Sequence, residues 1–346
     1  MDYRHIYEID MLRVVGAASV LLYHYTYRGS LVDGIRIPLF PVTEIATKYG
    51  YLGVSMFFMI SGFVILFSAL HKSPLRFAIS RMDRLYPAYW IAVSLTALTV
   101  ITFTDSIVSP LHYLMNLTMI NDYFDIPSID AIYWTLHVEL KFYFLIFVLM
   151  LLKQIKRYYI WIPIWLGATI TYMIARQPFF MGWFINPYYS PFFISGILFY
   201  LIYAEGFSWK KVILLVISLS ASIYNSVDQI GGFIMNPTTT DKVIVSIILI
   251  SLNILFLSIA TRKLTIKGSA MLVAAGGMTY PIYLLHARIG KILFNILSQD
   301  LNKYVVLMTI TLFVISLSFA VYTFFEKRLL GQISKLLTSA LPSRLL

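Results

Sequence analysis

The chain has 346 residues, of which 59% are hydrophobic and only 12% are charged, and its formal net charge is +11. Soluble domains contain roughly 25% charged residues, so this composition excludes a soluble protein and predicts an all-α membrane protein. The excess of Lys and Arg is typical of cytoplasmic loops in membrane proteins and does not indicate a nucleic-acid partner. The absence of Cys excludes disulfide bonds and thiol chemistry.

Apolar runs of membrane length predict one domain over residues 1–346, built as a bundle of about ten transmembrane helices. The approximate spans are 9–27, 51–70, 88–104, 132–152, 159–175, 188–204, 211–229, 243–260, 270–296 and 304–325. We expect the first span to be retained, because no small-residue cleavage site follows it. The tail at 327–346 is mostly apolar and predicts an amphipathic helix at the membrane surface.

Basic residues alternate between the segments that connect these spans. If the N-terminus is cytoplasmic, the inner segments hold most of the cations, among them Lys72, Arg76, Arg81, Arg84, Lys153, Lys156, Arg157, Lys210, Lys211, Arg262, Lys263 and Lys267. The outer segments hold most of the loop acids. We therefore expect both termini in the cytoplasm and long outer loops at 28–50 and 105–131.

The first span carries three ionisable residues, Asp10, Arg13 and His24. Arg13 and His24 lie about three helical turns apart, or ~16 Å, so they share roughly one side of the helix at two depths. Ionisable groups inside a bilayer are costly and usually functional. His24 has the chemistry of a general base, although a histidine near a span end is often only a headgroup-level residue.

Two later spans also carry ionisable residues that fall in the outer half of the membrane. Glu139, in WTLHVELKFY, would reach the depth of His24 and orient its imidazole. The alternative is a structural pair with Lys141 or with a neighbouring helix. His286 follows Tyr283 by one turn in MTYPIYLLHARIG, where a substrate contact and a structural hydrogen bond are both open.

Two further stretches suggest ligand contacts. The predicted loop LRFAISRMDRLYP projects Arg81 and Arg84, whose guanidinium groups suit phosphate but also satisfy the positive-inside rule. Ser61 and Gly62, in GVSMFFMISGF, are small residues that either allow close helix packing or leave room for an acyl or pantetheine arm. No metal-binding pattern, GxSxG, Walker loop or GxGxxG is present.

Taken in order, these stretches resemble the membrane acyltransferase-3 family, the multi-spanning O-acyltransferases of bacterial surface polysaccharides. The resemblance runs from residue 9 to about 326. It rests on Arg-x10-His (Arg13, His24), on GVSMFFMISGF, on Arg-x-x-Arg (Arg81, Arg84), on Trp-x-Leu-x-x-Glu-x-x-Phe-Tyr (Trp134, Glu139) and on Tyr-Leu-x-His (Tyr283, His286). Where relatives often have Glu-x-Pro at the last helix, this chain has Glu326-Lys327-Arg328. We expect the short form of the family, without an additional periplasmic domain.

The resemblance implies an acyl-coenzyme A donor, with acetyl-CoA expected from family frequency, and a lipid-linked or polymerised carbohydrate acceptor such as O-antigen or exopolysaccharide. It places the donor near Arg13, Arg81, Arg84, Ser61 and Gly62. It assigns His24 and Glu139 to catalysis, and Trp134, Tyr283 and His286 to the acceptor. It also implies a multi-pass protein of the bacterial plasma membrane in contact with lipids. Because the sequence has no metal-binding pattern, we expect no metal cofactor.

Three other functions remain open from the sequence. A transporter would suit the many spans, although no repeat relates the two halves. An acyltransferase with another acceptor or acyl group, such as peptidoglycan, a small molecule or a succinylated polysaccharide, would share the same motifs. A non-catalytic component of polysaccharide export would have no need for Arg13, His24 and Glu139.

Overall fold

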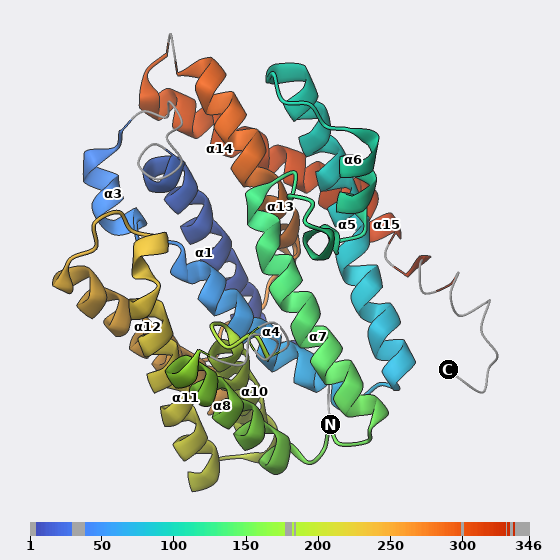
Figure 1. Cartoon of the computed structure of the whole chain (residues 1–346), viewed down its shortest axis with the longest axis vertical. Coiled ribbons are helices and arrows are strands. Elements are labelled where there is room, and N and C mark those ends of the chain that lie inside the picture. The colour runs from blue at the N-terminus through green and yellow to red at the C-terminus, as the bar shows by residue number, and fades with distance from the viewer. Residues whose placement is uncertain are drawn as a thin grey trace. The chain divides into compact units, whose positions relative to one another are not determined.

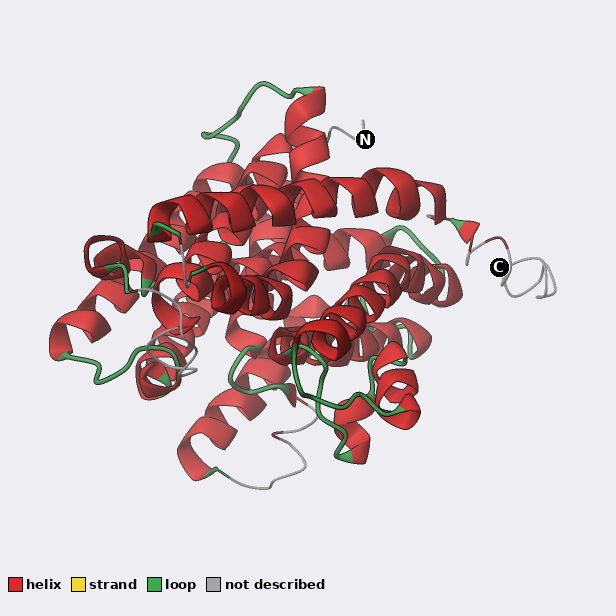
Figure 2. Cartoon of the chain, turned by 90° about the horizontal axis from the view of Figure 1, so that it is seen from above, coloured by secondary structure: helices red, strands yellow, loops and turns green. Residues whose placement is uncertain are grey.

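The computed structural model describes residues 5–29, 39–176, 182, 185–298, 301–329, 331, 332 and 335. Within these residues every regular element is a helix (Figure 2). The all-α fold predicted from composition is therefore confirmed. The chain forms two compact units, one made of residues through Gly16, Leu52–Ala78 and Val138–Val273, and the other of Ala17–Tyr51, Ile79–His137 and Ala274 onward.

The first unit is built around one short, fully apolar helix. This helix, α10, is Ser190–Glu205, and every residue from Ser190 to Ile202 is buried. It packs against α4 (Leu52–Leu70), α8 (Tyr158–Ala175), α11 (Trp209–Asp228) and α12 (Thr239–Ala260). Figure 1 shows α8, α10, α11 and α12 side by side. The unit also takes the start of α1 (Tyr7–Tyr23), most of α7 (Trp134–Leu151) and η4 (Ile230–Gly232).

Two glycines set the contact between α4 and α10. A Cβ on Gly62 would lie 2.1 Å from the backbone oxygen of Phe193, and a Cβ on Gly196 would lie 2.0 Å from that of Met59. The two backbones therefore touch, which is how small residues bring helices together in membranes. Close helix packing therefore explains Gly62, because the backbone of α10 occupies the space where a side chain would lie.

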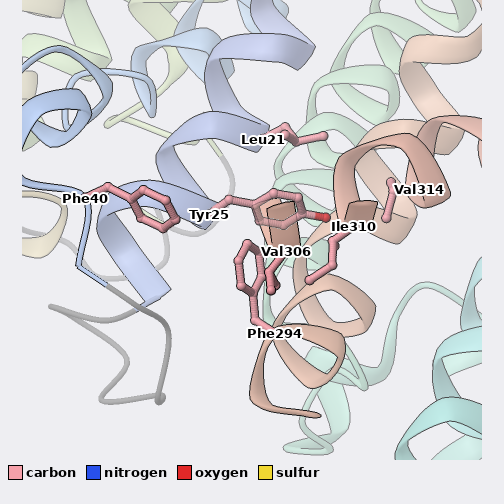
Figure 3. Close-up of a cluster of buried hydrophobic side chains, with 7 residues drawn as sticks. All are labelled: Leu21, Tyr25, Phe40, Phe294, Val306, Ile310 and Val314. Atoms are coloured by element: carbon pink, nitrogen blue, oxygen red, sulfur yellow. The ribbon is translucent and has the colours of Figure 1, made fainter. Parts of the chain in front are cut away.

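The second unit contains the remaining helices. They are η1 (His24–Arg28), α3 (Pro41–Thr47), α5 (Pro74–Phe103) from Ile79 onward, α6 (Pro110–Leu117), η2 (Asn121–Phe124), η3 (Ala131–Tyr133), α13 (Ala270–Leu297) from Ala274 onward, α14 (Lys303–Ala320), η5 (Val321–Glu326) and α15 (Lys327–Leu329). One buried cluster joins η1, α13 and α14; in Figure 3 the Tyr25 ring lies between Phe40 and Ile310. Phe294, Val306 and Val314 complete this cluster with Leu21.

Eight helical segments of the described chain are long and apolar enough to cross a membrane, and they correspond to eight of the ten predicted spans. The other two predicted spans are also helical. The span at 9–27 is the 17-residue α1 followed by the π-helical η1, and the span at 188–204 is the 16-residue α10. The predicted interfacial helix at 327–346 falls largely outside the described residues, as does part of the 28–50 loop.

The predicted cytoplasmic loop before the third span is not a loop. Helix α5 begins at Pro74 and runs through Arg81, Arg84 and Pro87 to Phe103. Proline is well accepted in the first turn of a helix, so Pro74 starts this one. The apolar count placed the beginning of the span at residue 88 because the charged first turns of the helix do not resemble a membrane segment.

The predicted outer loop at 105–131 contains α6, η2 and a buried amide. The Asn116 side chain accepts a hydrogen bond from the Ile129 backbone at 2.9 Å and donates one to the Pro127 carbonyl at 3.1 Å. Asn116 itself is fully buried. These bonds return the chain toward α6 and bring Asp130 to the start of η3.

Candidate active site

His24 lies where the first span changes its geometry. It is the first residue of the π-helical turn η1, and it is buried together with Tyr25, Thr26 and Tyr27. Its Nδ1 is buried and has no hydrogen-bond partner among the described residues. The His24 ring meets the His286 ring edge to face, with 5.1 Å between their centroids. Isolated π-helical turns are frequent at functional sites, so the structure adds to the signal at this residue.

His286 has one defined tautomer. Its Nδ1 lies 2.8 Å from the Tyr283 carbonyl oxygen and 3.2 Å from that of Ile282. Because a carbonyl oxygen only accepts, Nδ1 carries the proton and Nε2 keeps a lone pair. That Nε2 is buried and has no partner within the described part of the chain. His286 thus presents a hydrogen-bond acceptor in the interior of the second unit.

The backbone around His286 is held by side chains from distant parts of the sequence. The Tyr25 hydroxyl donates to the His286 carbonyl at 2.9 Å, and the Tyr133 hydroxyl donates to the Leu284 carbonyl at 3.4 Å. The Arg288 backbone N–H donates to a carboxylate oxygen of Asp130 at 2.7 Å. Side chains from outside α13 therefore fix residues 284, 286 and 288, which span little more than one helical turn, and this orients the His286 ring.

Asp130 is an acid of the outer segment that is withdrawn from solvent. It is 2% exposed and also accepts from the Ile132 backbone N–H at 3.3 Å, capping η3. Burial raises the pKa of the Asp130 carboxyl above its ordinary value, although the backbone donors of Arg288 and Ile132 and the charges of Lys291 and Arg288 oppose this effect. Asp130 was expected only as one of several outer-loop acids.

Tyr283, predicted to bind the acceptor, has its hydroxyl engaged by the fold. It lies 2.7 Å from the Thr135 hydroxyl and donates to the Ile132 carbonyl at 3.3 Å. Tyr283 thus joins α13 to the start of α7. Trp134, the first residue of α7, is half-buried beside these contacts. Acceptor binding by either residue stays a prediction.

Glu139 belongs to the first unit, whereas His24 and His286 belong to the second. One of its oxygens, Oε1, accepts from the Ser61 hydroxyl at 2.8 Å and from the Tyr143 hydroxyl at 2.5 Å. Sequence spacing does not indicate the first pair, because Ser61 and Glu139 are 78 residues apart. Tyr143 lies one turn after Glu139, so an i, i+4 pair was within reach of sequence reasoning. Two hydroxyl donors suit an ionised carboxylate.

Arg13 is held by its own helix. The guanidinium Nη1 donates to Asp10 at 3.0 Å, and the other Asp10 oxygen lies 2.5 Å from His5 Nε2. The Asp10 side chain is 5% exposed, whereas that of Arg13 is 28% exposed. The ion pair satisfies the buried acid.

Arg81 and Arg84 lie in the first turns of α5 and are both half-buried. The Arg84 guanidinium lies over the Tyr280 ring at 5.9 Å, and the Tyr280 hydroxyl donates to the Leu85 carbonyl at 3.1 Å. Tyr280, in α13, thus positions the basic turn of α5. Sequence reasoning treated Tyr280 only as part of the late motif.

A family model described as an acyltransferase domain matches residues 6–325. The chain belongs to the membrane acyltransferase-3 family. Comparison with curated proteins and with solved structures gave no match. The family match spans both units and every predicted site residue, and together with the apolar helices it identifies a multi-pass membrane acyltransferase.

Proposed function

We propose that this acyltransferase moves an acyl group, expected to be acetyl, from cytoplasmic acyl-coenzyme A to a carbohydrate hydroxyl on the outer side of the bacterial plasma membrane. The acceptor would be a lipid-linked or surface polysaccharide, such as O-antigen or exopolysaccharide. One observation carries the proposal: in a chain of this family, a buried histidine with an unsatisfied ring nitrogen, His24, meets a second buried histidine, His286.

His24 would act as the general base. A base placed against the reacting hydroxyl is worth about 10²–10⁴-fold in rate. Glu139, with donors from Ser61 and Tyr143, would assist proton transfer. A covalent acyl-enzyme and a direct transfer both fit these residues.

Arg81, Arg84 and Arg13 would bind the phosphates of the donor. Guanidinium groups suit phosphate because their planar donors match its oxygens. The positions of Arg84 over Tyr280 and of Arg13 beside Asp10 support this role, since each cation is held by the fold before a ligand arrives. The charge alternation predicts cytoplasmic termini, and with that orientation these arginines would lie toward the cytoplasm, where acyl-coenzyme A is made.

The test is acyl transfer in membranes that contain the full-length chain. Radiolabelled acetyl-coenzyme A is supplied with purified cell-surface glycan, and wild type is compared with His24→Ala. A matched control is His71→Ala, because His71 is an exposed histidine just after α4. Label entering the glycan with wild type and His71→Ala, but not with His24→Ala, supports the proposal.

Other results would contradict the proposed function or replace it with another. Equal transfer by wild type and His24→Ala removes His24 as the base. Failure of all three to label the glycan excludes this donor and acceptor pair, and succinyl-coenzyme A and peptidoglycan are then the next substrates to supply. Glycan movement across vesicles without ester formation would indicate a transporter.

A further inference from the structure

Two buried nitrogens that have no hydrogen-bond partner in the described part of the chain lie on neighbouring rings. They are Nδ1 of His24 and Nε2 of His286. The rings meet at 63° with centroids 5.1 Å apart. Buried polar atoms are nearly always satisfied, and an exception in a native fold calls for a specific explanation.

The tautomer of His286 determines what its partner must be. Since the Nδ1–H of His286 donates a hydrogen bond to the Tyr283 carbonyl, Nε2 is an acceptor and requires a donor. Nδ1 of His24 is an unsatisfied atom on the ring that faces it. If Nδ1 of His24 carries the proton, it supplies the kind of donor that Nε2 of His286 lacks, on a ring whose centroid lies 5.1 Å away.

We propose that His286 is the positioning residue for His24: its Nε2 accepts the Nδ1–H of His24, and His24 therefore keeps its lone pair on Nε2, the atom that takes the substrate proton. This inference rests on the proposed function for its catalytic meaning. It assigns His286 to orienting the catalytic base rather than to binding the carbohydrate substrate. It also gives His24 a partner that carries no charge.

Three hydrogen bonds fix the backbone that carries His286, the proposed hydrogen-bond acceptor for His24. Tyr25, Tyr133 and Asp130 fix the α13 backbone at residues 286, 284 and 288. A histidine on a fixed backbone with a fixed tautomer can set the tautomer of its neighbour, as a carboxylate does in a Ser-His-Asp triad. A neutral imidazole does this without placing a second charge inside the membrane, where charges are costly.

The step balances with these groups. The O–H bond of the acceptor hydroxyl breaks and its proton joins Nε2 of His24, while the oxygen electron pair forms the new bond to the thioester carbonyl carbon. The C–S bond breaks and the sulfur leaves with its electron pair. The proton on Nε2 then passes to that sulfur, giving the ester and free coenzyme A thiol. Throughout, the Nδ1–H of His24 remains donated to His286, which stabilises the imidazolium between the two transfers.

The first experiment reads the tautomers directly and requires no substrate. Full-length protein with ¹⁵N-labelled histidine is studied in detergent by NMR at a pH where histidines are neutral, and His24 and His286 are assigned from His24→Ala and His286→Gln. We expect both side chains to be protonated at Nδ1. A proton on Nε2 of His24, or on Nε2 of His286, overturns the proposal even if the activity is real.

The second experiment separates orientation from substrate binding. His286→Phe keeps a ring but removes the hydrogen-bond acceptor Nε2, whereas His286→Gln places an amide oxygen near the position of that atom. We expect kcat to fall about 10²-fold or more in His286→Phe, with KM changed by less than ~3-fold. His286→Gln should recover kcat to within about tenfold of wild type.

His71→Gln is the matched control, because Nδ1 of His71 also donates to the carbonyl one turn earlier, at 2.8 Å, but on an exposed residue. It should leave kcat unchanged. A raised KM with unchanged kcat in His286→Phe would indicate that His286 contacts the carbohydrate substrate, and it would overturn the positioning role. If wild type transfers no acyl group, the proposed function fails, whereas the tautomer measurement still decides the His24–His286 pairing.

Discussion

The hydroxyl of Tyr25 donates a 2.9 Å hydrogen bond to the backbone carbonyl of His286, a residue 261 positions later in the chain. The same tyrosine is fully buried in the cluster of Phe294, Val306 and Ile310. Packing therefore fixes the ring, and the ring fixes the carbonyl of the candidate catalytic turn.

Replacing Tyr25 with Phe should lower both stability and activity. The variant loses one buried hydrogen bond, worth about 0.5–1.5 kcal/mol, and keeps the apolar ring. We expect a lower Tm in detergent and a several-fold loss of kcat. Tyr304→Phe is the control, because Tyr304 is 53% exposed. Equal Tm values for the two variants would show that the Tyr25 bond contributes nothing.

Gly290 should not tolerate even a methyl group. A Cβ there would lie 2.3 Å from the Tyr25 hydroxyl oxygen, so Gly290→Ala must displace the Tyr25 ring from the cluster. Overpacking of this kind costs about 1–3 kcal/mol, and acyl transfer should fall with it. Gly167→Ala in α8 meets nothing within 4 Å and should stabilise the protein by about 0.5–1 kcal/mol. A tolerated Gly290→Ala would show that Tyr25 is not held as described.

The buried carboxyl of Asp130 should make the stability of the fold decrease as pH rises. Burial raises its pKa in the folded protein, so its contribution to stability is present below the unfolded pKa of about 3.9 and is lost as pH rises through the folded value. Asp130→Asn remains neutral and keeps one of the two acceptor oxygens, because Arg288 and Ile132 donate to different oxygens of Asp130. We expect the Tm of wild type to fall relative to that of Asp130→Asn as pH rises from 4 to 7.

Asp130→Ala separates the charge from the hydrogen bonds. It leaves two backbone donors without their acceptor, at a cost of about 1–3 kcal/mol, and should be less stable than Asp130→Asn at every pH. A constant difference in Tm between wild type and Asp130→Asn across this range would contradict the raised pKa.

Ser61 and Tyr143 should act on Glu139 together. Both donate to the same oxygen, so each single variant, Ser61→Ala or Tyr143→Phe, leaves one donor in place. We expect modest losses of acyl transfer in the single variants and a larger loss in the double variant, with a non-additive term of about 0.5–3 kcal/mol. Strict additivity, measured in kcat/KM, would mean that the two hydroxyls do not share the carboxylate.

Composition and apolar runs were enough to predict an all-α membrane protein, because lipid admits few ways to satisfy a backbone. They misplaced the start of α5, since the turns that carry Arg81 and Arg84 are helical but too polar to resemble a span. Helix α10 shows the reverse case. Its apolar run was found because a helix buried on all sides is apolar on all sides.

The candidate site was only partly predictable. His24 and His286 stood out because ionisable residues are rare in spans. Asp130, Tyr25 and Tyr133 did not, because their roles depend on bonds to residues 158, 261 and 151 positions away. No local pattern records such pairs. The π-helical turn at His24 likewise depends on packing, and its residues show no spacing that distinguishes it from an ordinary helix.

That turn implies a specific intolerance to length changes. A π-helical turn accommodates one more residue than an α-helical turn, so the chain between His24 and Arg28 holds an insertion relative to a regular helix. Removing Thr26 would restore regular winding and keep the residues after the turn close to their present register, because the wider turn holds the extra residue. A substitution in this turn alters single contacts, whereas this deletion would remove the wide turn that begins at His24.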